Sequence, residues 1–446
     1  MIPSLPLFRE ILQGIVNSKA KQGHVVAGLA EEITALPDSY DAMVAMGRRL
    51  THLPMQADWR FIEPNSLEEI WAECPPDRPV APIARVDVAA IAPRVECAFL
   101  SSVCGCILGK PLEINPTLDD IRTAAEKTGD WPIRDYISEG TLKAIGRKHS
   151  DWKGTIRGSI TAVEPDDDIN YTIIGMILLE EFGAGFTKQN VANKWLRNLP
   201  PGWCWGPERT MNINAAINTL GSKNVTEKDP FEDWVEFLNP GDEYCGALIR
   251  ADAYGYACPG HPALAAELAW RDASFTHRRT GIYGTMFAAA AISAAFVTKD
   301  PLEIFRIAAK YVPRRSRFYE VVADSIAMVE KAGDWLEGYR LIHNKYKEYG
   351  HCLIYQEIGT VINTLRFAED IGDGICKQVS QGNDTDSFGC TCGSILGAYF
   401  GPGKLDPRWL APFNDTIHVA LAAFHEQRLS AVARRMGQLP ARVLGG

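Results

Sequence analysis

Carboxylates and a hydroxyl lie close together near the C-terminal end of the chain. Asp384 and Asp386 are separated by one residue, and Ser387 follows directly. Oxygen donors held beside a helix N-terminus suit a hard divalent cation. Asp and Ser are also common N-caps, and a helix start rich in Asp needs no metal. This window alone therefore leaves a metal site and a helix cap open as interpretations.

A second acidic cluster lies more than two hundred residues upstream. Asp166, Asp167 and Asp168 are adjacent and open an apolar segment that has the pattern of a helix. Neighbouring carboxylates repel one another, and burying them is costly unless a cation neutralises their charge. Two such clusters predict a shared ion. Because the donors are all oxygens, Mg²⁺ or Mn²⁺ is favoured over zinc.

Two segments with small residues at every fourth position are predicted to position these acids. Gly389, Gly393, Gly397 and Gly401 follow the C-terminal cluster, and this spacing places them on one helical face that a second helix can approach closely. A helix predicted to begin near Arg94 has a similar face. Its repeating residues are Cys97, Ser101, Gly105 and Gly109.

Glu113 follows the Arg94 helix directly, on the turn beyond its predicted end at Gly109. A carboxylate beside a closely packed helix end is a candidate catalytic group. An ordinary solvated Glu is the equal alternative.

Composition excludes several classes of protein. The chain has 446 residues, is 46% hydrophobic and carries a formal net charge of −9. This acidic balance argues against a nucleic-acid partner or a membrane-surface partner, because both depend on a broad basic field. The longest apolar run, about 286–297, is too short to cross a bilayer. The eleven cysteines show no Cys-x-x-Cys spacing, which favours a reducing, cytoplasmic location without zinc or thioredoxin chemistry.

Periodicity indicates an all-α protein. Residues 1–93 read as a helical extension followed by a Pro-rich linker, with helices over 8–23, 39–53 and 66–74. Residues 94–446 read as one larger domain. No hairpin signal or sustained alternation interrupts the helical patterns, and the last helices are expected within 417–436.

Residues 94–446 resemble the ADP-ribosylglycohydrolase family, typified by dinitrogenase-reductase-activating glycohydrolase. The resemblance depends on the order of several windows more than on any single one. These windows are Gly105–Gly109 followed by Glu113, Asp166–Ile169, Gly246–Arg250, Thr276–His277, and Asp384–Ser387 preceded by Asn383.

The resemblance implies a compact orthogonal bundle with a binuclear Mg²⁺ site at its centre, in which Mn²⁺ is an alternative. Glu113 would be the acidic residue near the reacting sugar. Three positions depart from the family pattern: Cys106 stands where an acid is expected, Ile169 replaces a Thr hydroxyl, and Asp166 replaces a Thr and adds a negative charge. The implied metal ligands are Asp166 (in place of the family's first Thr), Asp167, Asp168, Asp384, Asp386 and Ser387.

The implied activity is Mg²⁺-dependent hydrolysis of the glycosidic bond between ADP-ribose and a modified side chain or small acceptor. Cleaving a ribosyl bond builds positive charge on the sugar, so an anionic pocket favours the transition state, and cations offset the repulsion of the pyrophosphate. Glu113, Asp167 and Asp386 are the candidates to accept a proton from the attacking water. The partner would be ADP-ribose or an ADP-ribosylated protein; the oligomeric state is unspecified.

Two other functions stay open. One is a glycosidase acting on another ribosyl conjugate or nucleoside derivative. The other is a catalytically silent member that binds ADP-ribose, which the changes at Cys106 and Ile169 favour.

Arg250, Tyr254, His277 and Phe388 are candidates for substrate binding, and Trp205 either packs against the protein or offers a stacking wall for a base. Arg250 either holds a phosphate or forms a buried ion pair. Tyr254 and Phe388, together with Trp205, are candidates to stack on adenine. His277 either faces the site or is a structural residue at a helix end.

Overall fold

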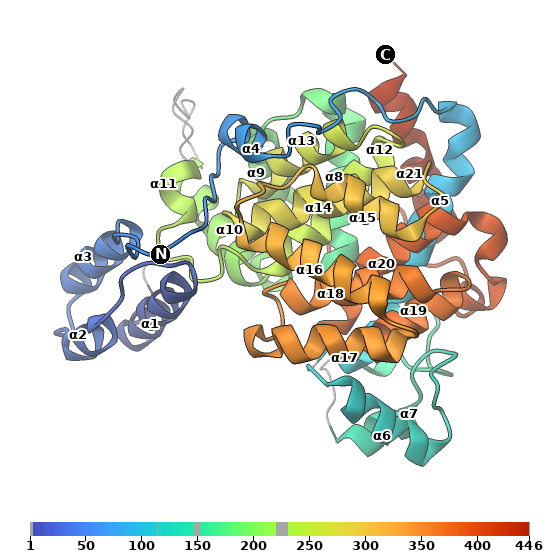
Figure 1. Cartoon of the computed structure of the whole chain (residues 1–446), viewed down its shortest axis with the longest axis horizontal. Coiled ribbons are helices and arrows are strands. Elements are labelled where there is room, and N and C mark those ends of the chain that lie inside the picture. The colour runs from blue at the N-terminus through green and yellow to red at the C-terminus, as the bar shows by residue number, and fades with distance from the viewer. Residues whose placement is uncertain (1–2, 114, 147–151, 220–230, 446) are drawn as a thin grey trace.

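The computed structural model describes residues 3–113, 115–146, 152–219 and 231–445, and within these residues it contains 21 α-helices, short 3-10 helices and four isolated β-bridges, with no strand. The predicted all-α class is confirmed. Figure 1 shows a large helical body and a small N-terminal lobe beside it.

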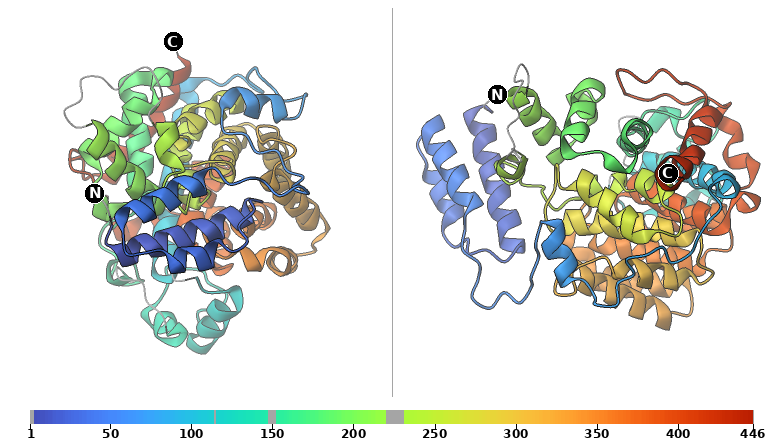
Figure 2. Two further views of the ribbon diagram at one scale, coloured as in Figure 1. Left: turned by 90° about the vertical axis from the view of Figure 1, so that its left-hand side faces the viewer. Right: turned by 90° about the horizontal axis from the view of Figure 1, so that it is seen from above.

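The N-terminal lobe has a small hydrophobic core of its own. It is built from α1 Leu5–Lys21, α2 Leu29–Ala35 and α3 Tyr40–Thr51, and it lies apart from the body in two perpendicular views (Figures 1 and 2). Buried apolar side chains of the three helices pack against one another. The helices predicted over 8–23 and 39–53 correspond to α1 and α3, whereas the short α2 was not predicted.

Residues 52–87 form a strap that joins the lobe to the body. It carries one helix, α4 Leu67–Glu73, whose N-cap Ser66 accepts a hydrogen bond from the backbone N–H of Glu69, as expected. Ile70 of α4 packs in the core of the body, so the extension is attached by apolar packing as well as by polar contacts.

The longest helix of the body, α5 Val88–Gly109, begins six residues before the predicted start at Arg94. The side chain of Asp87 accepts hydrogen bonds from the N–H groups of Ala89 and Ala90, and this cap outweighs the proline at position 93 inside the helix. The apolar stretch Val88–Leu112 is long enough to cross a membrane, but about two-thirds of its most apolar part is buried inside the protein. It is longer than the run at 286–297 named from the sequence.

The second central helix, α20 Thr385–Phe400, packs closely against α5. A Cβ atom added at Gly389 would lie 2.4 Å from the carbonyl oxygen of Gly105, and one added at Gly393 would lie 2.3 Å from that of Ser101. The predicted small-residue faces are therefore the contact between these helices. Their packing brings the end of α5 to the start of α20.

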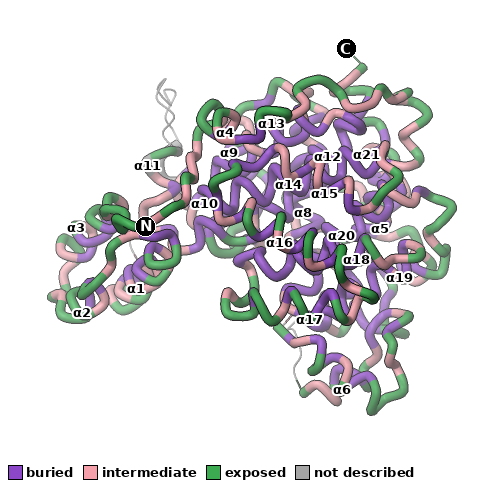
Figure 3. Tube along the Cα trace, viewed as in Figure 1, coloured by how far each residue is buried: buried purple, intermediate pink, exposed green. Residues whose placement is uncertain are grey.

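The other helices surround this pair, and buried residues concentrate between them (Figure 3). The prediction of helices from 417 onward is wrong in part, because residues 417–428 form bridged loops and the last helix begins at Leu429. The remaining helices are α6 Leu118–Thr128, α7 Glu139–Ile145, α8 Asp167–Phe182, α9 Lys188–Asn198, α10 Gly206–Thr219, α11 Phe231–Val235, α12 Asp252–Ala257, α13 Pro262–Ala273, α14 Thr280–Ala295, α15 Pro301–Ala309, α16 Arg317–Lys331, α17 Trp335–Tyr346, α18 Tyr355–Phe367, α19 Ile371–Ser380 and α21 Leu429–Leu444.

Candidate active site

Two helix N-termini and one helix C-terminus bring the acidic clusters together. Asp166 to Asp168 lie at the start of α8, Asp384 to Ser387 lie at the start of α20, and Glu113 follows the end of α5. The Ser387 hydroxyl lies 3.3 Å from Asp168 Oδ2, so the two clusters are in direct contact. Thr385 Oγ1 donates to the carbonyl of Gly109 at 2.8 Å and fixes the start of α20 against the end of α5.

Lys110 lies among these carboxylates. Its Nζ is 2.6 Å from Asp166 Oδ2, 2.8 Å from Glu113 Oε2 and 3.3 Å from Asp386 Oδ2. Burial would lower the pKa of this ammonium, but the surrounding carboxylates, Asp166 first, raise it well above its usual value. Lys110 is therefore a fixed positive charge inside the acidic cluster.

One ammonium does not neutralise the whole cluster. Burial raises the pKa of Asp168 and Asp384 well above the ordinary value, and the neighbouring carboxylates Asp166 and Asp386 raise it further. The pKa of Asp167 is also raised, by burial and then by Asp166. Asp166 is the exception, because Lys110 and hydrogen bonds outweigh its burial and lower its pKa. The site therefore favours binding of an additional cation.

Helix capping accounts for one cluster but not for the other. Asp166 is a true N-cap, because its Oδ1 accepts a hydrogen bond from the N–H of Asp168 at 3.0 Å. Asp384 occupies the N-cap position of α20, yet its side chain makes no capping hydrogen bond. The carboxylate of Asp384 is thus held in the site without a structural role in starting its helix.

The donor set fits a hard divalent cation. Asp168 Oδ1 and Asp386 Oδ1 are buried and have no hydrogen-bond partner among the described residues. Oxygens of Glu113, Asp384 and Asp386 lie within 4.8 Å of one another, which is close enough to share one ion. Buried, unpartnered carboxylate oxygens beside a serine hydroxyl are suitable ligands for Mg²⁺ or Mn²⁺.

The acidic cluster opens to a pocket of ≈ 160 Å³. A larger pocket of ≈ 650 Å³ lies between the strap and α16–α17, but none of the clustered carboxylates lines it. The smaller pocket is therefore the candidate active site. Its lining includes Glu113, Asn115, Asp167, Trp205, Gly206, Pro207, Glu208, Tyr244, Cys245, Gly246, Ile249, His351, Cys352, Asp384 and Ser387.

The predicted substrate-binding residues lie in the core and do not line this pocket. Arg250 forms buried ion pairs with Glu208 at 2.8 Å and Asp272 at 2.7 Å, so the structure favours the ion-pair alternative. The Tyr254 hydroxyl donates to Asp272, and its ring stacks on Phe186. Neither side chain is available to a ligand in the pocket.

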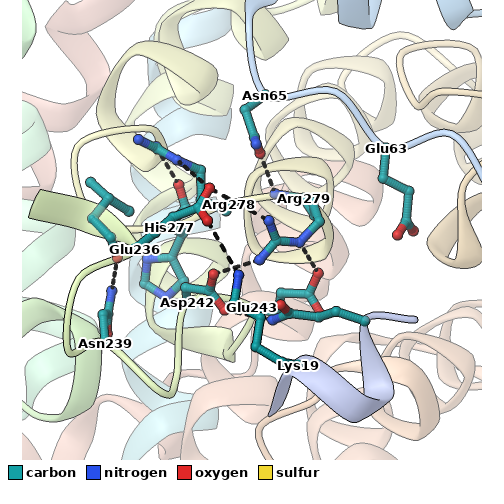
Figure 4. Close-up of polar contacts among 12 residues, drawn as sticks. Lys19, Glu63, Asn65, Glu236, Asn239, Asp242, Glu243, His277, Arg278 and Arg279 are labelled. Carbon is teal, nitrogen blue, oxygen red and sulfur yellow. Dashed lines mark hydrogen bonds and ion pairs between the residues drawn. The ribbon is translucent and has the colours of Figure 1, made fainter. Parts of the chain in front are cut away.

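His277 and Phe388 are also buried, with exposed fractions of 0% and 1%. His277 Nδ1 is 2.7 Å from Thr276 Oγ1, and burial lowers the pKa of this histidine well below its usual value. In Figure 4 His277 lies beside Arg278 and Asp242, away from the contact between Asn65 of the strap and Arg279. Of the predicted stacking residues only Trp205, 56% exposed, lines the pocket.

Several site residues were missed by sequence reasoning. Lys110 was not among the predicted site residues, although a lysine three residues before Glu113 is a signal for an ion pair. Cys245 and Cys352 are separated by more than one hundred residues, and no local spacing connects them. Glu208 follows the aromatic loop and is buried under the pocket, where burial raises its pKa to about 7 despite Arg250.

Two of the three departures from the family pattern, Cys106 and Ile169, are buried at or beside the acidic cluster. The Cys106 thiol is fully buried and within 4.8 Å of oxygens of Asp166 and Asp168. Ile169 is 1% exposed, on α8 directly after the acidic cluster.

Comparison with known proteins identifies the family of the chain. The profile of the ADP-ribosylglycohydrolase family matches residues 87–439. No curated protein matches the chain. Among solved structures, a chain described as "ADP-ribosylglycohydrolase-related protein complex" is similar at 17% identity and a TM-score of 0.46, and the alignment covers 78% of this chain and 99% of that chain.

Proposed function

Because the chain belongs to the ADP-ribosylglycohydrolase family, we propose that it is an Mg²⁺-dependent hydrolase of the glycosidic bond between ADP-ribose and a modified side chain or small acceptor. The observation that carries this proposal is that three acidic segments meet beside one pocket. Glu113, Asp167, Asp384 and Ser387 line the pocket, and Asp166, Asp168 and Asp386 are buried next to them. Three distant segments of the chain supply these acids. Such an anionic cluster stabilises the positive charge that develops on a ribosyl group as its glycosidic bond breaks.

The proposed ion is Mg²⁺, with Mn²⁺ as a substitute and two ions as the expected number. In the proposed arrangement Asp166, Asp167, Asp168, Asp386 and Ser387 would hold one ion. Glu113, Asp384 and Asp386, whose oxygens lie within 4.8 Å of one another, would hold the second. Such ions would orient the ribose hydroxyls and neutralise the pyrophosphate. Lys110 is the positive charge that the chain itself contributes, and it keeps Asp166 ionised.

Glu113 is the proposed proton acceptor. It lies on the pocket wall with a side chain that is 28% exposed, so that a water molecule in the pocket can reach its carboxylate. Burial and the charge of Asp386 raise its pKa, and Lys110 opposes them. Because the pKa of Glu113 is raised to about 11 without a metal, this carboxyl is protonated at neutral pH in that state. A bound cation would have to lower its pKa before it could accept a proton from the attacking water. Asp167 and Asp386 are the alternative acceptors.

Trp205 is the proposed wall for the adenine ring. Its side chain is exposed at the pocket, and the Arg209 guanidinium lies 4.7 Å from the centre of its ring. An exposed indole next to a cation offers a stacking face for a base and a positive charge for a phosphate.

The test measures release of free ADP-ribose from an ADP-ribosylated peptide in the presence of Mg²⁺. The double variant Asp384→Ala plus Asp386→Ala should lose activity at least about 1,000-fold, since it removes oxygens from both ion groups. The exposed Asp119→Ala is the matched control and should retain full activity. Undiminished turnover by the double variant would rule out the metal-dependent mechanism.

Two alternatives are separated by the same assay. A panel of ribosyl conjugates and nucleoside derivatives identifies a different glycosidase if one of them is cleaved faster. Binding of ADP-ribose without turnover identifies a catalytically silent member, which the thiol of Cys106 at an acidic position favours. A cytoplasmic location is part of the proposal, because all eleven cysteines are free and ten of them are buried.

A further inference from the structure

Two thiols accompany the carboxylate of Asp384 at the pocket. Cys245 Sγ is 3.3 Å and Cys352 Sγ is 3.7 Å from Asp384 Oδ2, and the three ligand atoms lie within 4.8 Å of one another. The residues come from three separate elements: the start of the 3-10 helix Cys245–Arg250, the loop before α18, and the start of α20. Folding alone brings this dithiol and carboxylate together.

The spacing of these atoms matches one metal coordination sphere. Zinc binds thiolate sulfur at about 2.3 Å and carboxylate oxygen at about 2.1 Å in tetrahedral geometry, which separates the sulfur and oxygen atoms by about 3.6 Å. The observed separations of 3.3 and 3.7 Å lie on either side of this value. Cys245, Cys352 and Asp384 can therefore bind one ion without rearrangement of the backbone.

Charge also points to a cation at this position. Within the described part of the chain, Asp384 is 6% exposed and has no ion pair, and its side chain does not cap α20. Lys110 contacts Asp166, Asp386 and Glu113 but not Asp384. A second buried acid, Glu357, accepts a hydrogen bond from the N–H of Cys352 through Oε1, while its Oε2 has no partner among described residues. Among the described residues, no positively charged side chain therefore balances Asp384 and Glu357 beside Cys245 and Cys352.

We propose that Cys245, Cys352 and Asp384 form a binding site for a soft divalent cation such as Zn²⁺, open to the pocket. The two thiols release their protons to solvent when the ion binds, and the thiolates with Asp384 supply three ligands. The fourth position faces the pocket, where it is available to water or to an oxygen of a bound ligand. Soft sulfur donors select this ion over Mg²⁺.

The hydrogen bond from Cys352 N–H to Glu357 at 3.1 Å holds the loop, and the φ angle of 65° at Cys352 directs its side chain.

A second thiol group in the molecule, Cys106 with Asp166 and Asp168, differs in that Lys110 already neutralises Asp166 at 2.6 Å. It serves as the control for the location of the site.

The test is titration of the full-length, metal-free chain with Co²⁺ and Zn²⁺ under anaerobic, reducing conditions. One Co²⁺ should bind with the near-ultraviolet absorption of cobalt–thiolate coordination, and Zn²⁺ should displace it. Cys245→Ser and Cys352→Ser should each weaken Zn²⁺ binding by about 100-fold or more and remove the absorption. Cys106→Ser should leave both unchanged.

A second measurement uses the unaltered protein. Zn²⁺ should protect Cys245 and Cys352 from alkylation by iodoacetamide, as detected by mass spectrometry of the peptides. The proposal is overturned if no thiolate absorption appears, if it survives in the Cys245→Ser plus Cys352→Ser variant, or if Zn²⁺ leaves alkylation unchanged. Because these readouts use no substrate, they do not depend on the hydrolase proposal, which is tested separately by ADP-ribose release in Mg²⁺.

Discussion

At the scale of single residues, the site is governed by where positive charge is placed among the carboxylates. Lys110 contacts three of them, whereas Asp384 forms no ion pair among the described residues and accepts hydrogen bonds from the thiols of Cys245 and Cys352. Removing one partner of a buried ion pair costs far more than removing an exposed one, because the remaining charge is left without compensation. The two halves of the cluster should therefore respond differently to substitution.

The substitution Lys110→Met tests whether Lys110 compensates the charge of the carboxylates that it contacts. Without the ammonium, Asp166 and Asp386 lose their buried partner, so the metal-free variant should be destabilised by about 3–5 kcal/mol. Mg²⁺ should raise the Tm of this variant more than that of the wild type, since the ion replaces the missing charge. Differential scanning calorimetry in EDTA and in Mg²⁺ measures both effects.

Lys143→Met is the matched control, because Lys143 pairs with Glu139 on the surface, where both side chains are about half exposed. It should change stability by less than about 1 kcal/mol. Equal Tm values for Lys110→Met and wild type in EDTA would show that Lys110 does not compensate the cluster.

At the scale of elements, the contact between α5 and α20 determines whether the site exists. These helices touch backbone to backbone at Gly105 and Gly389, and Gly109 meets the backbone of Thr385 in the same way. The approach fixes the end of one helix against the start of the other, which is where Lys110, Glu113 and the C-terminal acids lie.

Gly389→Ala should destabilise the protein by at least about 3 kcal/mol, because its Cβ would lie 2.4 Å from a backbone oxygen of α5 that cannot move alone. Gly403→Ala, where no atom lies within 4 Å of the added Cβ, should stay within about 0.5 kcal/mol of wild type. Urea denaturation measures both. A stable Gly389→Ala protein would contradict the backbone contact.

A buried carboxylate joins a third helix to this pair. Asp252, the first residue of α12, accepts hydrogen bonds from Ser394 Oγ of α20 at 2.5 Å and from Ser102 Oγ of α5 at 3.3 Å. Burial raises its pKa from 3.8 to about 7. Between these two pH values Asp252 is protonated in the folded state and ionised in the unfolded state. The free energy of unfolding therefore falls as pH rises from about 4 to about 7.

Asp252→Asn should remove this loss of stability. The free energy of unfolding of the variant relative to wild type should rise by about 2 kcal/mol or more between pH 4.5 and pH 8, because the amide has no charge to bury. Chemical denaturation at a series of pH values measures the difference. The same change at the exposed Asp58 should leave the curve parallel to wild type, and a parallel curve for Asp252→Asn would refute the assignment.

At the scale of the whole molecule, a buried polar network attaches the N-terminal lobe and the strap to the body. Arg279 of the body pairs with Asp242 at 2.5 Å and Glu243 at 2.8 Å, and its backbone N–H donates to Asn65 of the strap (Figure 4). From the lobe, Lys19 pairs with Glu236. Because the lobe has its own core, these contacts decide how firmly it is held.

Arg279→Met should cost about 3–5 kcal/mol, since it leaves Asp242 and Glu243 buried with reduced compensation. Hydrogen exchange should also increase at the C-terminal end of α1, because Gln22 donates a hydrogen bond to Asp242, which loses its ion pair with Arg279. Arg408→Met breaks an exposed pair with Asp406 and should cost less than about 1 kcal/mol. Unchanged exchange in α1 would show that the lobe is held by its other contacts.

The sequence by itself determined the helical class, the approximate helices and the acidic residues of the candidate site. These follow from local rules: the period of apolar residues, capping positions and the spacing of small residues. The close approach of two helices was predictable because glycines at every fourth position allow little else. Helix ends were less accurate, as at Val88, where the cap at Asp87 outweighs a proline.

Tertiary structure alone decided which polar residues face the pocket. Arg250 and His277 resemble site residues in sequence, but packing against Asp272 and Thr276 places them in the core. Lys110 reached the acids, and Cys245 met Cys352, only because distant elements pack side by side. Sequence pattern specifies the face of an element, whereas the meeting of two side chains depends on the three-dimensional path of the chain between them.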